Sequence, residues 1–315
     1  MEPPTEPRNL PAVLDLLRRR GHPVRAGVAM AGDVSRRRYF RLALERDGTA
    51  VLALYPPDLE ETCRRFLRAG ELLAGAGVRV PEVLDQDCGA GWALLEDLGE
   101  RTLYEHEDRP WTELGAYFEE AVRTLGRIAS LPPAPVASLN PTLDRELLSR
   151  ELRQTRELFL VPLRLDGGRD GESLLRRELE TALETVCTRL GDESPVPCHR
   201  DFGARNLVPL ASGFELGVLD HQDLRMGPPA YDLASLLNDS LFPPPDVAER
   251  LLALAGVGTG VGVGSSAGGG TGAGPGSRAA SGAGRPDRES YHRAAAQRTL
   301  KAIGSYAAFA GRGSG

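Results

Sequence analysis

Short apolar runs and turn-forming residues alternate along the N-terminal part of the chain. Residues 12–20 carry apolar side chains at helical spacing, which predicts a helix. Three apolar runs then predict strands over residues 25–30, 38–44 and 50–55. The sequence Arg-Asp-Gly at residues 46–48 is a hairpin signal, so we expect the second and third of these strands to form a hairpin.

One helix and one further strand complete this region. Residues 59–74 form an amphipathic helical pattern that ends at Gly75 and Gly77. Residues 92–96 (WALLE) form an apolar run that predicts a buried strand. Three strands, a helix and a strand in this order predict a small α+β lobe with a sheet, which we place at residues 1–98.

From residue 111 onward the spacing of apolar residues is mainly helical. The pattern predicts helices over 111–130, 144–159, 173–190, 231–238 and 289–310, and short strands over 205–209 and 214–219. We therefore expect a larger, mainly helical C-terminal lobe over residues 99–315.

A glycine-rich segment interrupts this lobe. Between residues 256 and 284, 13 of 29 residues are glycine and the only charged residue is Arg278. Such a segment cannot bury enough apolar surface to offset the entropy of ordering its backbone. We expect a flexible insertion within residues 256–288.

The composition excludes several classes of function. The formal net charge is −6, which disfavours a general nucleic-acid or anionic-membrane binder because both need a basic surface. No apolar run approaches the roughly 20 residues that span a bilayer, and the N-terminal residues lack the apolar core of a secretory signal. We expect a cytoplasmic protein that binds neither nucleic acid nor membrane; the oligomeric state stays open.

The four cysteines show no metal-site spacing. Cys63, Cys88, Cys187 and Cys198 are dispersed and form no CxxC pair. A disulfide framework is not expected in a cytoplasmic protein, so we expect reduced thiols.

One short stretch carries the pattern of phosphoryl-transfer chemistry. Residues 198–206 (CHRDFGARN) contain a His-Arg-Asp triplet with an asparagine five residues after the aspartate, and Asp220 follows an apolar run. A carboxylate is needed to orient an attacking hydroxyl and accept its proton, which is the role we assign to Asp201. Mg²⁺ prefers hard oxygen ligands, which Asn206 and Asp220 supply. A strand-turn-strand over residues 207–219 would fold Asp220 back beside Asn206.

Four neighbouring residues need an interpretation of their own. Asp223 is either a ligand of a second metal ion or a solvated or turn-capping residue. His199 is expected to brace the loop through backbone hydrogen bonds rather than to bind a transition metal, and His221 is not expected to bind one either. Asp232 either complements the N-terminal end of a helix or holds the backbone of the catalytic loop; we favour the second role.

These motifs resemble a known superfamily. The stretches at 198–206, at 217–223 (GVLDHQD) and at 227–237 (GPPAYDLASLL) are similar to the aminoglycoside-phosphotransferase superfamily, which has a bilobal protein-kinase-like fold. The stretches at 32–41 (GDVSRRRYFR), 94–99 (LLEDLG) and 296–304 (AQRTLKAIG) most resemble the bacterial cell-wall-recycling kinases of N-acetylmuramate and N-acetylglucosamine, which phosphorylate the anomeric hydroxyl.

The resemblance implies a nucleotide site in the N-terminal lobe. Glu96 and Leu98 would belong to the hinge whose backbone holds adenine. The turn from Gly32 to Ser35 would cover the phosphates of ATP, with its backbone N–H groups forming an anion cradle.

One departure from the superfamily concerns lysine. The only lysine in the chain is Lys301, so the usual phosphate-binding lysine of the third strand is absent. An arginine of the second strand could replace it, because guanidinium binds phosphate well. Arg41 is the first choice and Arg38 the second; three residues apart on one strand, they face opposite sides.

The leading hypothesis is therefore an ATP- and Mg²⁺-dependent kinase that phosphorylates a hydroxyl of an amino sugar. One alternative is a phosphotransferase acting on an aminoglycoside or another hydroxylated metabolite. A second alternative is a pseudokinase that binds nucleotide with little or no turnover, which the missing lysine favours and the intact Asp201, Asn206 and Asp220 disfavour.

Overall fold

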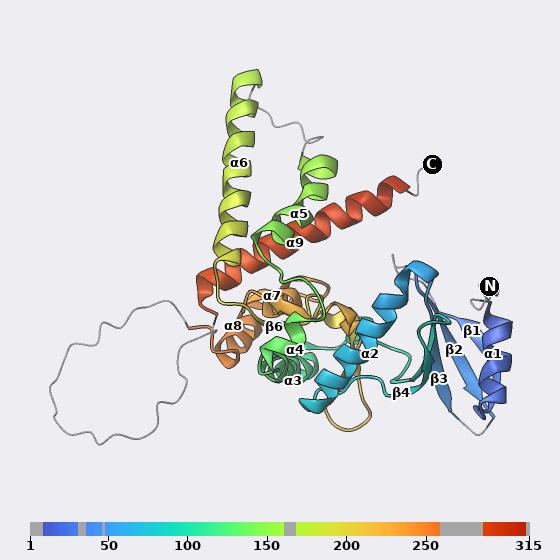
Figure 1. The fold of residues 1–315 in the computed structure, drawn as a ribbon. Helices are drawn as coiled ribbons and strands as arrows, with labels where there is room; N and C mark the ends of the chain where they lie inside the picture. Colours follow the sequence, from blue (N-terminus) through green and yellow to red (C-terminus); the bar gives the residue numbers. More distant parts are fainter. Residues whose placement is uncertain (1–8, 31–35, 46–47, 161–167, 259–285, 313–315) are drawn as a thin grey trace, which may run out of the picture.

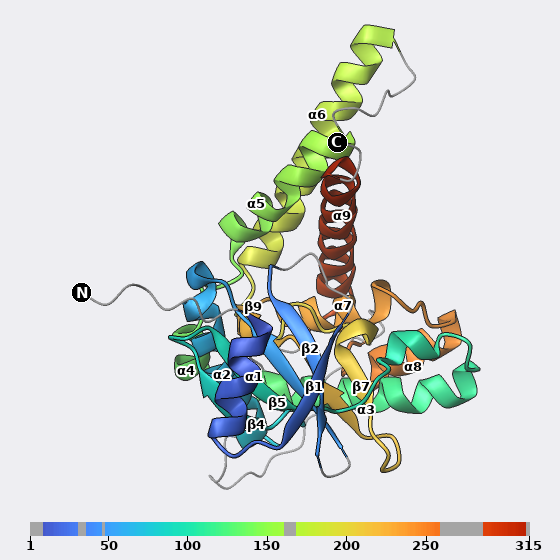
Figure 2. The same ribbon diagram turned by 90° about the vertical axis from the view of Figure 1, so that its right-hand side faces the viewer.

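The computed structural model describes most of the chain in two lobes (Figures 1 and 2). A small lobe built on a sheet stands beside a larger, mainly helical lobe. The described residues are 9–30, 36–45, 48–160, 168–258 and 286–312. The bilobal α+β, kinase-like fold class expected from the sequence is confirmed.

The small lobe is a five-stranded antiparallel sheet in the order β1-β2-β3-β5-β4. Its elements are α1 (Leu10–Arg19), β1 (Val24–Ala29), β2 (Arg38–Leu44), β3 (Thr49–Leu54), α2 (Glu60–Gly75), β4 (Val83–Asp87) and β5 (Trp92–Glu96). The sequence did not predict β4, an edge strand whose Val83 and Leu84 are exposed. Such a strand lacks the apolar alternation that marks a half-buried one.

Both faces of the sheet are covered, which explains the continuous apolar run of β3. Leu52 and Leu54 pack with residues of α1 on one face. Ala53 and Tyr55 pack with Phe66 of α2 on the other face. Because successive side chains of a strand point to opposite faces, this run requires a helix on each side.

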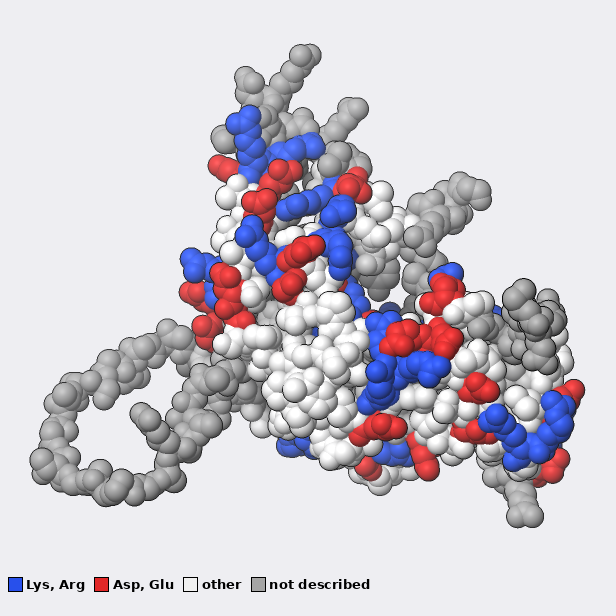
Figure 3. Space-filling view, viewed as in Figure 1, with Lys and Arg blue, Asp and Glu red and all other residues white. Residues whose placement is uncertain are grey.

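The large lobe surrounds one extended core. Its helices are α3 (Trp111–Ala129), α4 (Pro133–Ala137), α5 (Arg145–Thr155, continued by a π-helical turn at Arg156–Leu160), α6 (Gly168–Gly191), α7 (Tyr231–Asn238), α8 (Pro245–Leu254) and α9 (Arg288–Arg312). Acidic and basic side chains are interspersed over α5 and α6 rather than separated by sign (Figure 3). In the parts of the chain just listed, no helix combines the length and apolar character that a membrane crossing requires.

Two small antiparallel pairs frame the catalytic region. The strand β6 (Val196–Cys198) pairs with β9 (Arg225–Gly227), and β7 (Leu207–Pro209) pairs with β8 (Leu216–Val218). The expected strand over 205–209 is shorter than predicted, because Ala204–Asn206 form a 3₁₀ turn before it. The glycine-rich insertion lies almost wholly in residues 259–285, outside the described residues, so its flexibility stays a prediction.

The expectation of reduced thiols is wrong for one pair of cysteines. Cys63 of α2 and Cys88, which follows β4, form a disulfide with their Cα atoms 5.7 Å apart. The two residues are 25 positions apart in sequence, and the packing of α2 on the sheet brings them together in one apolar cluster. Sequence spacing cannot show such a contact. Cys187 and Cys198 are free and buried.

Candidate active site

The catalytic-loop motif lies between β6 and β7, and a buried carboxylate holds its backbone. Asp232 of α7 accepts hydrogen bonds from the backbone N–H groups of His199 (2.5 Å) and Arg200 (2.8 Å). Arg200 has φ of 80°, a left-handed conformation that is uncommon outside glycine. The two hydrogen bonds to Asp232 stabilise this turn, which leads directly into Asp201.

The His199 side chain adds a second brace to the loop. Its Nε2–H donates to the Leu219 carbonyl at 2.9 Å, which ties the loop to the end of β8 next to Asp220. His221 has a separate position: it stacks on Phe66 of α2, and its Nε2–H donates to the Phe66 carbonyl at 3.2 Å. Burial, together with the nearby His199, lowers the pKa of His221 to about 3, so its imidazole is neutral at physiological pH.

Asp201 faces two cations from the C-terminal helix. Its Oδ1 lies 3.0 Å from Nη2 of Arg298 and 3.3 Å from Nζ of Lys301. Burial alone would raise the pKa of Asp201, but Lys301, Arg298 and Arg200 outweigh burial and lower the pKa far below its ordinary value. The Asp201 side chain is therefore a carboxylate at neutral pH. In the sequence, Arg298 and Lys301 belong to the stretch at 296–304 that resembles the family, which does not indicate their contact with Asp201.

Asn206 contacts both Asp201 and Leu219, the residue before Asp220. The Asn206 side-chain N–H donates to the Asp201 carbonyl at 2.8 Å, and the Leu219 N–H donates to the Asn206 carbonyl at 2.8 Å. Asp220 has the left-handed φ of 59° at the end of β8. With its amide nitrogen anchored, Asn206 can offer its side-chain oxygen to a metal ion, and its backbone contact with Leu219 places it next to the turn that carries the Asp220 carboxylate, the second oxygen donor. This pair of donors fits a Mg²⁺ ion.

Arg37 is the functional candidate that sequence reasoning missed. Its Nη2 lies 2.7 Å from Oδ1 of Asp220, and only 9% of its side chain is exposed. The Gln222 side chain donates to the same oxygen at 3.0 Å. Arg37 directly precedes β2 and stands in the run Arg36-Arg37-Arg38. Nothing in that run distinguishes the arginine that contacts Asp220 from the other two.

The other arginine candidates lie elsewhere. Arg41 forms two hydrogen bonds with Asp97, at 2.6 and 3.0 Å, and a third with the Gly99 carbonyl at 2.7 Å. Arg38 is exposed, with its guanidinium over the Phe40 ring. Arg41 thus ties β2 to the segment joining the lobes. The phosphate-binding role given to Arg41 and Arg38 stays a prediction.

The expected hinge and phosphate turn are placed in part. The Glu96 side chain ion-pairs with Arg79, and its other oxygen accepts the Glu82 backbone N–H at 3.1 Å. The Leu98 side chain packs so closely on Gly217 that a Cβ there would lie 2.5 Å from Leu98 Cδ1. Gly32 and Ser35 fall outside the described residues.

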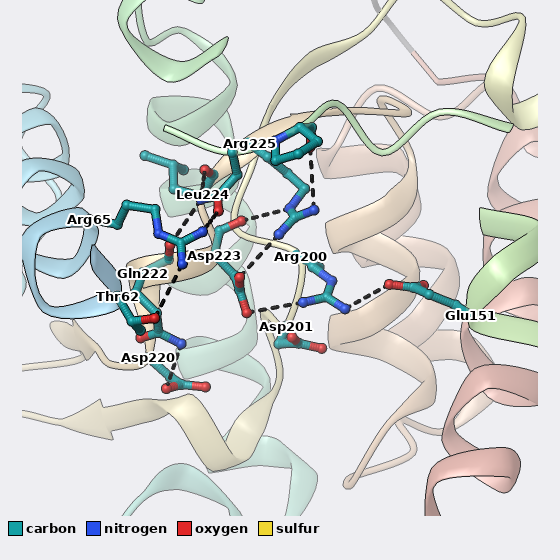
Figure 4. Close-up of polar contacts among 12 residues, drawn as sticks. Thr62, Arg65, Glu151, Arg200, Asp201, Asp220, Gln222, Asp223, Leu224 and Arg225 are labelled. Atoms are coloured by element: carbon teal, nitrogen blue, oxygen red, sulfur yellow. Dashed lines mark hydrogen bonds and ion pairs between the residues drawn. The ribbon is translucent and has the colours of Figure 1, made fainter. Parts of the chain in front are cut away.

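An ion-pair network joins the loop to Glu151 of α5 and, through Asp223, to Arg225 of β9 (Figure 4). Arg200 lies 2.7 Å from Glu151 of α5 and 3.0 Å from Asp223, and Arg225 lies 3.0 Å from the other oxygen of Asp223. The Asp223 carboxylate is therefore shared by two guanidinium groups. This arrangement favours neither of the two roles weighed for it from the sequence.

Comparisons with known proteins agree with this geometry. A family model described as the phosphotransferase enzyme family matches residues 27–264. The N-acetylmuramate/N-acetylglucosamine kinase of Pseudomonas aeruginosa is 35% identical over 229 residues, 71% of this chain and 63% of that protein. The protein of the same name from Neisseria meningitidis is 33% identical over 214 residues, 67% of this chain and 61% of that protein. The aligned region thus spans less than two thirds of each relative.

Solved structures share the fold at low sequence identity. A macrolide 2′-phosphotransferase from Brachybacterium faecium superposes with a TM-score of 0.64 at 18% identity, covering 96% of this chain and 93% of that one. An aminoglycoside phosphotransferase from Streptomyces rimosus gives a TM-score of 0.58 at 18% identity, covering 93% and 98%. These likenesses show the fold, and the family model, which matches well over half of the chain, identifies the chain as a member of the phosphotransferase enzyme family.

Proposed function

We propose that this protein transfers the γ-phosphoryl group of ATP to the anomeric hydroxyl of an amino sugar of the N-acetylmuramate or N-acetylglucosamine type. The observation that carries the proposal is the ionised, partly buried Asp201, whose backbone carbonyl accepts a hydrogen bond from the Asn206 side chain, while Asn206 contacts the residue before Asp220. The names of relatives that align with 67–71% of the chain support the substrate class. Use of ATP under this proposal fits a cytoplasmic location.

Asp201 orients the sugar hydroxyl and receives its proton. Both cations contact Oδ1 of Asp201, so Oδ2 is the oxygen left to accept a hydrogen bond from the hydroxyl. Because the pKa of Asp201 is low, this carboxylate is a weak base. We therefore expect the proton to move late, once the new oxygen–phosphorus bond has largely formed and the hydroxyl has become acidic.

Asn206 and Asp220 would hold Mg²⁺ on the nucleotide phosphates. When bound, the metal ion neutralises phosphate charge and orients the γ-phosphoryl group. We assign the binding of the nucleotide phosphates to Arg37, because it contacts the proposed metal ligand Asp220. Arg41 is instead bonded to Asp97. The backbone from Glu96 to Leu98 is our proposed adenine site.

The charges around Asp201 disfavour an aminoglycoside as the substrate. An aminoglycoside is polycationic and needs carboxylates near the reacting hydroxyl. In this chain, Arg298 and Lys301 contact the catalytic carboxylate and would repel such a ligand. A neutral or anionic sugar meets no such penalty.

A substrate panel tests the proposal. ADP release would be measured with N-acetylmuramate, N-acetylglucosamine, kanamycin and a macrolide, each with Mg-ATP. We expect the highest kcat/KM for one of the two amino sugars and no turnover of kanamycin. Turnover of kanamycin alone would reverse the assignment, and ATP binding without turnover of any acceptor would favour the pseudokinase alternative.

A further inference from the structure

We propose that Lys301 of α9 is a catalytic residue that binds the phosphoryl group during transfer, and that Arg298 is a positioning residue that holds Asp201 for it. This inference rests on the proposed kinase function but not on the identity of the sugar. It makes α9, about 100 residues after the catalytic loop in sequence, part of the catalytic machinery.

The first argument is distance. Nζ of Lys301 lies 3.3 Å from Oδ1 of Asp201, the carboxylate that orients the attacking hydroxyl. In a reactive complex that hydroxyl lies about 3 Å from the carboxylate and about 3–3.5 Å from phosphorus. The phosphoryl oxygens therefore come within the reach of a flexible ammonium group that already contacts the carboxylate.

The second argument is that contacts with α5 and α7 hold the part of α9 that carries Arg298 and Lys301. Gly304 packs against α5 so closely that a Cβ there would lie 2.3 Å from Oγ1 of Thr155. The Thr155 hydroxyl donates to the Leu300 carbonyl at 2.6 Å, in the same turn as Lys301. Arg298 Nε donates to the Ser235 hydroxyl of α7 at 3.0 Å. The backbone of α9 is thus held by α5, and the Arg298 side chain is held by α7 at its Nε and by Asp201 at its Nη2.

The third argument is the cost of burying the only lysine of the chain. The Lys301 side chain is 12% exposed, and burial lowers its pKa while Asp201 opposes the change. A buried ammonium group is expensive to keep charged unless it has partners. Its other carboxylate, Glu151, is 4.0 Å away and is bonded to Arg200. An ammonium with three donors therefore has capacity left for a phosphoryl oxygen.

The proposed step is balanced as follows. The sugar oxygen forms a bond to the γ-phosphorus while the bond between that phosphorus and the β,γ-bridging oxygen breaks. The bridging oxygen keeps the electron pair and leaves on ADP, and the hydroxyl proton passes to Oδ2 of Asp201. Lys301 stays protonated and donates to a γ-phosphoryl oxygen, supplying next to the catalytic loop a positive charge that β3 does not provide.

Kinetics of three α9 variants and one control variant on the same helix test the assignment. We expect Lys301→Met to lower kcat by about 10²–10³-fold with little change in the KM of either amino sugar, and Lys301→Arg to restore part of the rate. Arg298→Met should lower kcat less. The matched control is Arg293→Met, because Arg293 lies on the same helix but pairs with Glu289. It should behave like the parent, and melting temperatures should show that all variants fold.

A second readout does not depend on the sugar. Lys301→Met should weaken binding of Mg-ADP-aluminium fluoride, which mimics the transferring phosphoryl group, by at least about tenfold while leaving Mg-ADP binding unchanged. This result in a protein that phosphorylates no sugar of the panel would support the role of Lys301 and overturn only the proposed substrate. Equal effects on both ligands, or an unchanged kcat, would overturn the role of Lys301. So would a loss confined to the KM of N-acetylmuramate, which would mean that Lys301 binds its carboxylate instead.

Discussion

The residues of the catalytic motif and the cations that contact its carboxylates come from very different parts of the chain. His199, Asp201, Asn206, Asp220 and Asp232 belong to one stretch of sequence, and backbone hydrogen bonds connect them. The cations in contact with Asp220 and Asp201 come from opposite ends of the chain: Arg37 precedes β2, and Arg298 and Lys301 lie on α9. The motif thus carries the carboxylates of the proposed site, whereas the packing of two distant segments supplies the cations that contact Asp201 and Asp220.

The largest effect should come from the acidic side. Asp201→Asn removes the acceptor of the hydroxyl proton while keeping the shape of the side chain, so we expect kcat to fall about 10²–10⁴-fold. Single-turnover kinetics would measure this loss, and calorimetry should show that Mg-ADP still binds. A variant that keeps more than half of the parent rate would exclude Asp201 as the base.

The next effect concerns the proposed metal site. Asp220→Ala removes the only full negative charge that we assign to Mg²⁺, so affinity for Mg-ATP and turnover should fall together, each by about tenfold or more. The control is Asp223→Asn, because Asp223 pairs with Arg200 and Arg225. Mg²⁺ titrations should shift for the first variant only. A shift of the same size in the control would support the second-metal role of Asp223.

A smaller effect should separate the arginines of the nucleotide side. Arg37→Gln should weaken ATP binding by about 1 kcal/mol or more, which is the scale of a charge-assisted hydrogen bond. Arg41→Gln is the matched variant, since Arg41 bonds to Asp97 and the Gly99 carbonyl. Calorimetric Kd values would rank the two. A loss of ATP affinity confined to Arg41→Gln would restore the assignment made from the sequence.

The contrast between the two kinds of groups also explains what the sequence predicts. Spacing within 198–232 was enough to indicate a shared site, because a short strand-turn-strand returns Asp220 to Asn206. The spacing of apolar residues likewise predicts most helices, and the short apolar runs predict most strands, of both lobes. Arg37 was missed because three consecutive arginines look alike in sequence. The contacts of Lys301 and the Cys63–Cys88 disulfide depend on tertiary packing, which has no local signal.

The last effect is on stability rather than activity, and it concerns the junction between α2 and the turn that we propose binds the metal ion. His221 is neutral in the folded protein, with its pKa lowered to about 3. A histidine in the unfolded chain has a pKa of about 6.5. Between these values the unfolded chain binds more protons, so stability falls as the pH decreases from about 6.5 toward 3. At pH 5.5 the free energy of unfolding is lower by about 1.4 kcal/mol because of this group.

Melting temperatures at pH 7.5 and 5.5 check this expectation. The parent should lose a few degrees that are not lost by His221→Gln, which keeps a donor for the Phe66 carbonyl. Equal losses in both proteins would show that another group causes the pH dependence.

The most direct test of the account is to identify the product. The protein would be incubated with Mg-ATP and N-acetylglucosamine or N-acetylmuramate, and ³¹P NMR would show which sugar carbon carries the phosphate. The account predicts an anomeric sugar phosphate, formed with one ADP per sugar, and its absence when Asp201→Asn replaces the parent over the same time. Phosphate on another carbon would contradict the proposed position, and product formed equally by both proteins would contradict the central role of Asp201.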